Sequence, residues 1–127
     1  MPGPLIFVSR SRVKTGKREQ YDAHLRDATE IIDSEEPRMI GFNTYLSDDG
    51  SDTSTVQIHP DEESLDTHLK IFFEGLAERV FQTLDSYEID IYGTPSQAAL
   101  QSVTGLPGVT VRVLPVHLGG FLRPQPL

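Results

Sequence analysis

The chain has 127 residues, of which 37% are hydrophobic and 24% charged, a composition typical of one soluble globular domain. Its formal net charge of −8, from 19 acidic and 11 basic residues, argues against the positive surface that nucleic-acid binding requires, so we expect no nucleic-acid partner. Cysteine is absent, which excludes disulfides and cysteine-ligated metals, and the lack of a signal peptide or an apolar membrane span predicts a cytoplasmic protein with no membrane partner.

The first half of the chain predicts a strand, a helix and a hairpin. Residues 5–13 are rich in β-branched and aromatic side chains, and both faces of this strand begin apolar, so we expect both to be covered. Apolar residues at helical spacing then predict a helix that Pro37 ends: Tyr21, Leu25, Ala28 and Ile32. Residues 39–47 and 52–59 predict two strands joined by a turn around 48–50.

The second half predicts another helix and strand, followed by a tail of different character. Pro60 and the three acids after it suit the first turn of a helix. Its apolar face is expected at six positions: Leu65, Leu69, Phe72, Leu76, Val80 and Leu84. Gly75 lies inside this run and is expected to kink it or allow a close contact. Residues 86–93 predict a fourth strand, and 109–118 have the β-branched content of a fifth.

The order of these elements is β-α-β-β-α-β, which predicts an α+β fold with a ferredoxin-like antiparallel sheet over residues 1–94. Helices cover one face of such a sheet, and several strands here are apolar on both sides. We therefore expect a homodimer in which the sheets face each other. Residues 95–127 are expected to form a C-terminal extension that packs on the same domain or across the dimer.

The segment HPDEESLDTHL, residues 59–69, places two histidines on either side of an acidic helix start. Together with the element order, it resembles the antibiotic biosynthesis monooxygenase superfamily of dimeric α/β barrels. In that resemblance His68 matches a helical histidine, His59 a position where many members have tryptophan, and Gln57 one where they often have glutamate. It covers residues 4–94 and implies a dimer. Some members oxidise quinols or anthrone-type polyketides with oxygen and no cofactor.

The haem-degrading branch of this superfamily uses a helical histidine together with an asparagine on the first strand and a tryptophan. This sequence has His68, but it carries Ser9 and Ser11 on the first strand and contains no tryptophan. Haem degradation is therefore a minor alternative.

His68 is the candidate catalytic residue. It borders the apolar stripe of the second helix, three residues after Leu65 and four before Phe72, and can face the space between helix and sheet. Its imidazole titrates near neutral pH, which suits removal of a proton from a phenolic hydroxyl. The alternative is a partly buried histidine held by a backbone carbonyl or a nearby acid.

Four further residues are candidates for substrate binding. Asn43 and Tyr45 share one face of the second strand and can hydrogen-bond a substrate oxygen or stack on a ring, unless both lie at the dimer interface. His59 ends a polar strand face and can line the pocket or the dimer contact, and Phe72 offers an aromatic wall. The spacing of His59 and His68 matches no recognised ligand motif, so no metal is predicted.

Two functions remain open from the sequence. The first is a cofactor-independent monooxygenase acting on a small aromatic hydroxyl compound, with His68 as base and with Asn43, Tyr45 and His59 orienting the substrate. The second is a non-catalytic homodimer that binds a small hydrophobic or aromatic ligand in the same pocket. A cavity beside His68 that Phe72, Phe73 and Tyr21 leave open would favour the first.

Overall fold

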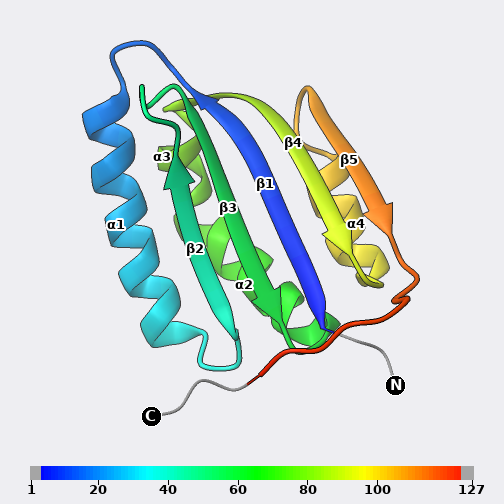
Figure 1. Cartoon of the computed structure of the whole chain (residues 1–127). Coiled ribbons are helices and arrows are strands. Elements are labelled where there is room, and N and C mark those ends of the chain that lie inside the picture. The colour runs from blue at the N-terminus through cyan, green and yellow to red at the C-terminus, as the bar shows by residue number, and fades with distance from the viewer. Residues whose placement is uncertain (1–3, 124–127) are drawn as a thin grey trace.

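The computed structural model of the chain describes residues 4–123. Its elements in chain order are β1 (Leu5–Val13), α1 (Arg18–Glu35), β2 (Gly41–Leu46), β3 (Asp52–His59), α2 (Glu62–Gly75), α3 (Ala77–Phe81), β4 (Leu84–Tyr92), α4 (Gln97–Thr104) and β5 (Val109–Leu114). The predicted α+β order is confirmed, with the second helix divided into α2 and α3 (Figure 1).

The five strands form one sheet in the order β2-β3-β1-β4-β5, with β1 at its centre. β1 is antiparallel to both neighbours, and β2 is antiparallel to β3. β5 is parallel to β4. The antiparallel sheet predicted over residues 1–94 is confirmed, and β5, a strand of the C-terminal extension whose direction the sequence does not indicate, adds to its edge in parallel. Parallel neighbours need a crossover connection, and the segment that contains α4 supplies it.

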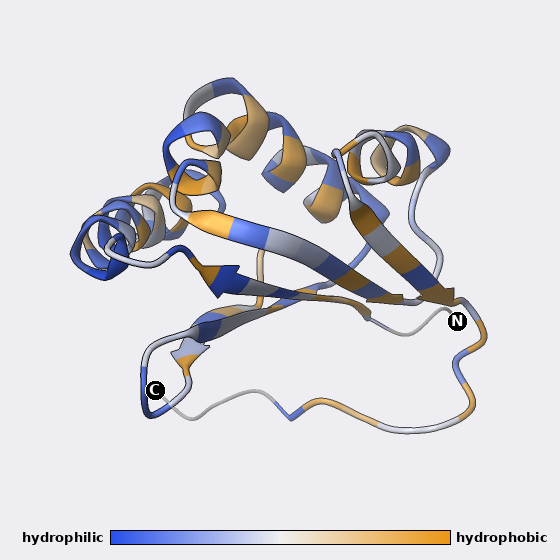
Figure 2. Ribbon diagram, turned by 90° about the horizontal axis from the view of Figure 1, so that it is seen from above, coloured by the Kyte–Doolittle hydropathy of each residue, from blue (hydrophilic) through white to orange (hydrophobic). Residues whose placement is uncertain are grey.

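The helices lie on one face of the sheet and leave the other face without a helix (Figures 1 and 2). Strand alternation decides which side chains meet them: Leu5 and Phe7 are buried, whereas Ile6 and Val8 between them are half-buried on the opposite face. The main core lies between helices and sheet and contains Leu5, Phe7, Leu65, Leu69, Ile89, Ile91, Ala99 and Val103.

The predicted interruption at Gly75 is a break between two helices. α2 ends at Gly75, and Leu76, which donates its N–H to the Phe72 carbonyl at 2.8 Å, adopts a non-helical conformation before α3 begins. Glycine weakens a helix interior because it has the most backbone freedom to lose. The break lets α3 present Phe81 to two other aromatic rings, with centroids 5.6 Å from Phe72 and 5.0 Å from Tyr87.

The C-terminal segment joins the same core and sheet as far as Leu114. Ala99 and Val103 of α4 are buried in the main core. On the helix-free face, Asp90 of β4 bridges Arg10 of β1 and Arg112 of β5 at 3.1 and 3.2 Å. Residues 115–123 have no helix or strand and run along that helix-free side of the sheet (Figure 2).

A pair of matched valine substitutions measures this packing. Val103 is 1% exposed and Val116 is 82% exposed. Val103→Ala is expected to lower the free energy of unfolding by about 2 kcal/mol, because it removes buried methyl groups and leaves a cavity. Val116→Ala is expected to change it by less than about 0.5 kcal/mol. Urea unfolding followed by circular dichroism gives both values, and equal effects would show that α4 contributes nothing to the core.

Candidate functional site

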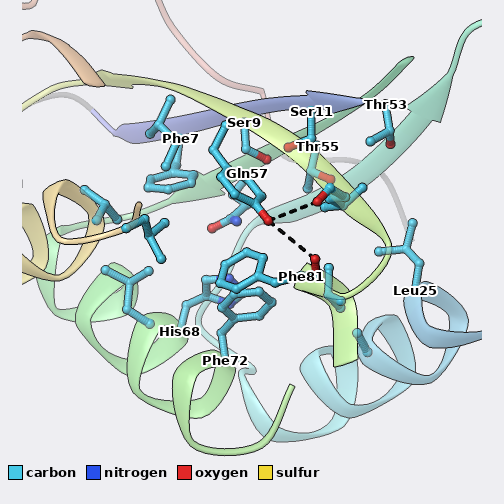
Figure 3. A pocket seen from close by; sticks show the side chains of 18 of the residues that line it. Phe7, Ser9, Ser11, Leu25, Thr53, Thr55, Gln57, His68, Phe72 and Phe81 are labelled. Carbon is cyan, nitrogen blue, oxygen red and sulfur yellow. Dashed lines mark hydrogen bonds between the residues drawn. The ribbon is translucent and has the colours of Figure 1, made fainter. Parts of the chain in front are cut away.

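A cavity of about 100 Å³ lies between the sheet and the helices (Figure 3). Its floor carries short polar side chains from the sheet: Ser9, Ser11, Thr53, Thr55 and Gln57. Its walls are mainly apolar and aromatic, and include Phe7, Phe42, Leu69, Phe72, Phe73, Phe81 and Ile89. His68 stands among these wall residues, and no Lys, Arg, Asp or Glu of residues 4–123 lines the space. The cavity therefore suits an uncharged, largely apolar compound with oxygen substituents.

His68 is a buried wall residue of the cavity, 3% exposed, and it is held by an acid at the C-terminal end of α1. Its Nδ1 lies 3.1 and 3.0 Å from the two carboxyl oxygens of Glu36, which is itself 6% exposed. As a carboxylate, Glu36 can only accept, so His68 donates from Nδ1. The second ring nitrogen, Nε2, is then left with its lone pair free.

The free Nε2 of His68 opens on the cavity. It makes no hydrogen bond within the described residues. Protein atoms do not enclose this nitrogen completely. Among the described residues, the side-chain nitrogen that is both completely enclosed and without a hydrogen bond belongs to His24, not to His68. An imidazole with one nitrogen bonded to a carboxyl group and the other open on a cavity has the geometry of a general base.

Two phenylalanines orient the His68 ring. Phe72 stacks on it with centroids 6.1 Å apart and planes 20° apart, and Phe42 packs at 6.0 Å in a tilted arrangement. Phe72 follows His68 by one helical turn, which is why the two rings meet. The predicted aromatic wall at Phe72 is thus part of the cavity lining.

His59 is fully buried at the end of β3, and both of its ring nitrogens have partners. Its Nδ1 lies 2.8 Å from Ser64 Oγ and its Nε2 lies 3.0 Å from Gln57 Oε1. Its ring centroid is 5.9 Å from that of His68. Burial lowers the pKa of His59 from 6.5 to about 4, with a further lowering by His68 and a smaller opposite effect of Asp61. His59 is therefore neutral at physiological pH and stands behind the cavity lining.

No family model and no curated protein matches the chain. Solved structures do. A candidate antibiotic biosynthesis monooxygenase from Bacteroides thetaiotaomicron shows 18% identity and a TM-score of 0.63, over 68% of this chain and 85% of that one. A point mutant of SnoaB, a cofactor-independent oxygenase from Streptomyces nogalater, shows 12% identity and a TM-score of 0.61, over 74% and 95%.

The chain shares the fold of these proteins. The resemblance seen in the element order and in residues 59–69 is thereby confirmed for the fold. MupZ from Pseudomonas fluorescens shares it at 16% identity with a TM-score of 0.69, over 97% of this chain and 91% of that one. The likeness to MupZ therefore includes the C-terminal segment.

Asn43 and Tyr45 lie away from the cavity. Their β2 neighbours Phe42 and Leu46 pack toward the helices, so the alternate residues point to the helix-free face. Both are exposed, Tyr45 to 66%. The structure thus brings His59, His68 and Phe72 together and leaves Asn43 and Tyr45 outside. Their position fits the predicted alternative, a contact with a partner subunit.

Sequence reasoning missed Glu36 as a site residue. In the sequence it belongs to the acidic run before Pro37, which is typical of a solvated helix end. In the structure Glu36 follows the last residue of α1, and its N–H donates to the Ile32 carbonyl at 2.9 Å. The chain turns there toward β2, and this turn directs the carboxyl inward. Two consecutive glutamates before a proline give no indication in the sequence that the second one is buried.

Within residues 4–123, no three His, Cys, Asp or Glu side chains gather as a metal site would require. No helix of this part of the chain is both long and apolar enough to cross a membrane.

The lowered pKa of His59 makes a pH-dependent contribution to stability. The unfolded chain takes up a proton on His59 below about pH 6.5, whereas the folded chain does so only near pH 4. The stabilisation is therefore complete above pH 6.5 and is lost as the pH falls through that window, by about 3 kcal/mol in all.

Urea unfolding of the wild type and of His59→Gln at about pH 7 and about pH 4.5 measures this contribution. The stability difference between the two proteins is expected to shrink toward the lower pH, because the variant has no imidazole to protonate. Stability curves that stay parallel would contradict a neutral His59 in the folded chain.

Proposed function

We propose that this protein is a cofactor-independent monooxygenase that oxidises a small aromatic hydroxyl compound with molecular oxygen. The observation that carries the proposal is the buried His68–Glu36 pair, with Nδ1 bonded to the carboxyl group and Nε2 open on an apolar cavity. The fold shared with SnoaB, named a cofactor-independent oxygenase, supports the same reaction type.

In the proposed reaction His68 Nε2 removes the proton of the substrate hydroxyl. The resulting anion is electron-rich enough to give electrons to oxygen directly, and Glu36 stabilises the imidazolium that forms. For a quinol, O₂ places one oxygen atom on a ring carbon as a hydroxyl group, the quinol becomes the quinone, and the second oxygen atom leaves as water. For an anthrone, O₂ converts the ring CH₂ group to a carbonyl and again releases water. In both reactions the substrate supplies the four electrons that reduce O₂.

The size of the cavity favours a compound with one ring. Its volume of about 100 Å³ is of the order of the ~150 Å³ cavity that holds benzene in another protein. A quinol therefore fits the space better than a three-ring anthrone, which needs the aromatic side chains to move. The absence of Lys and Arg from the described lining argues against substrates recognised by a phosphate or carboxylate.

Oxygen uptake tests the reaction and its base. The metal-stripped wild type is expected to consume oxygen faster than the spontaneous rate with at least one quinol of a panel that also contains anthrones. His68→Ala is expected to reduce kcat by about 10²- to 10⁴-fold. Glu36→Gln, which keeps an acceptor oxygen but removes the charge, is expected to reduce it by about tenfold. His117→Ala is the control, since this exposed histidine lies outside the cavity.

Two outcomes of this experiment would contradict the proposal. Uptake that survives in His68→Ala would place the base elsewhere. No uptake with any compound of the panel would favour the second function, a non-catalytic protein that binds a small aromatic ligand in the same cavity.

We further propose that the chain forms a homodimer through the helix-free face of its sheet. Tyr45 and Leu114, which point to this face, are exposed at 66% and 44%. The segment that follows β5 on the same side exposes Leu118 to 97% and Phe121 to 75%. Apolar side chains gathered in this way favour burial against a second copy.

Light scattering after size-exclusion chromatography tests the dimer. The wild type is expected to show twice the chain mass of 14.1 kDa at micromolar concentration. The double variant Leu118→Asp, Phe121→Asp is expected to shift toward the monomer, because it places charges in the apolar contact. Ala23→Asp with Thr67→Asp adds the same charge to exposed positions on the helices and should stay dimeric. A monomeric wild type would refute the packing argument.

A further inference from the structure

Gln57 is a buried amide on the floor of the cavity, 5% exposed. It stands on β3 between Phe7 of β1 and Phe42 of β2, its partners in the two neighbouring strands. Its Oε1 is engaged by His59, whereas its Nε2 makes no hydrogen bond within residues 4–123. Protein atoms do not enclose this nitrogen completely either. In the described part of the chain, it is not one of the completely buried side-chain atoms that lack a hydrogen bond. One polar end of Gln57 therefore opens on the cavity (Figure 3).

The direction of the hydrogen bonds behind Gln57 follows from Ser64. The Ser64 hydroxyl is buried, and its contact with His59 Nδ1 at 2.8 Å is its hydrogen bond in the described structure. A buried hydroxyl has one proton to donate, so Ser64 donates and His59 Nδ1 accepts. The ring proton of a neutral His59 is then on Nε2, from which it is donated to Gln57 Oε1 at 3.0 Å.

This chain of donors leaves the Gln57 amide in one orientation. With its oxygen bound to the His59 N–H, the NH₂ group is the part of the amide that faces the cavity. The reverse orientation would need the other tautomer of His59 and would leave the Ser64 proton buried without an acceptor, which costs free energy. A fully buried, neutral His59 thus serves to hold Gln57 as a donor.

We propose that the Gln57 side-chain amide donates a hydrogen bond to the substrate oxygen that His68 deprotonates, and that His59 and Ser64 are positioning residues that fix this donor. The inference rests on the proposed function and adds the group that holds the developing negative charge. His59 packs against His68 at 5.9 Å and bonds to Gln57, so the base and the donor flank one corner of the cavity. A fixed donor aimed at a developing oxyanion stabilises it without reorganisation.

The probe is 4-nitrophenol, whose phenolate absorbs at longer wavelength than its phenol. The wild type is expected to bind it with the phenol pKa lowered, visible as a phenolate band below the pH at which the free compound ionises. Gln57→Leu keeps the approximate size of the side chain but removes the donor. It is expected to weaken phenolate binding by about tenfold and to raise the pKa of the bound probe.

Nitrobenzene, which has the same ring without the hydroxyl, controls for the shape of the cavity. Its affinity is expected to be equal for the wild type and Gln57→Leu. Ser64→Ala is expected to reduce the phenolate band in the same direction by a smaller factor, because the His59 tautomer is then no longer fixed. Ser64→Thr, which retains the hydroxyl, is expected to restore the band.

Several results would overturn the inference. The first is a wild type that forms no phenolate band up to the solubility limit of the probe. The second is a phenolate band that is unchanged in Gln57→Leu. The third is a loss of nitrobenzene binding in Gln57→Leu as large as its loss of phenolate binding. Its failure is distinguishable from that of the proposed function. Oxygen uptake with an unchanged band in Gln57→Leu would reject the donor and keep the oxygenase. A phenolate band that depends on Gln57, in a protein that takes up no oxygen, would keep the donor and reject the oxygenase.

Discussion

The buried hydrogen bond between Glu36 and His68 is the interaction on which the site depends. It joins the C-terminal end of α1 to the middle of α2, elements far apart in the sequence, and both side chains are almost completely removed from water. Two polar groups in such a place are tolerated because each satisfies the other, and loss of either would leave its partner uncompensated. The same contact decides which nitrogen of His68 carries a proton. One interaction therefore fixes both the docking of two helices and the chemistry of the cavity.

The sheet divides the molecule into two regions of different character. On the helical side, β1 and β3 bring apolar residues and a row of small polar residues into one enclosed space. On the other side, the Asp90 bridge to Arg10 and Arg112 ties three neighbouring strands, with apolar residues around it. A strand has only these two faces to offer. A strand side chain that points into the cavity therefore cannot also point to the helix-free face.

This alternation explains which parts of the site were predictable from the sequence. The element order and the inward direction of His68 follow from hydrophobic spacing, and the structure agrees. The irregularity expected at Gly75 follows from the glycine itself, although the structure has a break between two helices there and not a kink in one. Asn43 and Tyr45 were placed on the same face as each other, which is correct. The sequence does not decide whether that face lines the cavity or contacts a partner subunit. Both faces of β2 carry apolar and polar residues, so the alternation of β2 does not distinguish the two.

The unpredicted parts all depend on contacts between distant segments. Glu36 lies 32 positions before His68, and no local pattern separates it from its exposed neighbour Glu35. Gln57 was noted only as a departure from a family pattern, since its meaning comes from His59 and Ser64 across the corner between β3 and α2. The parallel β5 was missed for the same reason: strand content predicts a strand, whereas its direction is set by how α4 crosses the sheet.

The two histidines illustrate how one corner can hold chemically identical groups in different roles. Their rings are 5.9 Å apart, but the hydrogen-bond partners differ. His68 has a carboxyl group at one nitrogen and open space at the other. His59 has a hydroxyl and an amide oxygen, and its burial favours the neutral ring. Two positive charges at that separation in a low-dielectric site would repel strongly. Keeping His59 neutral therefore leaves the corner free to accept a proton at His68.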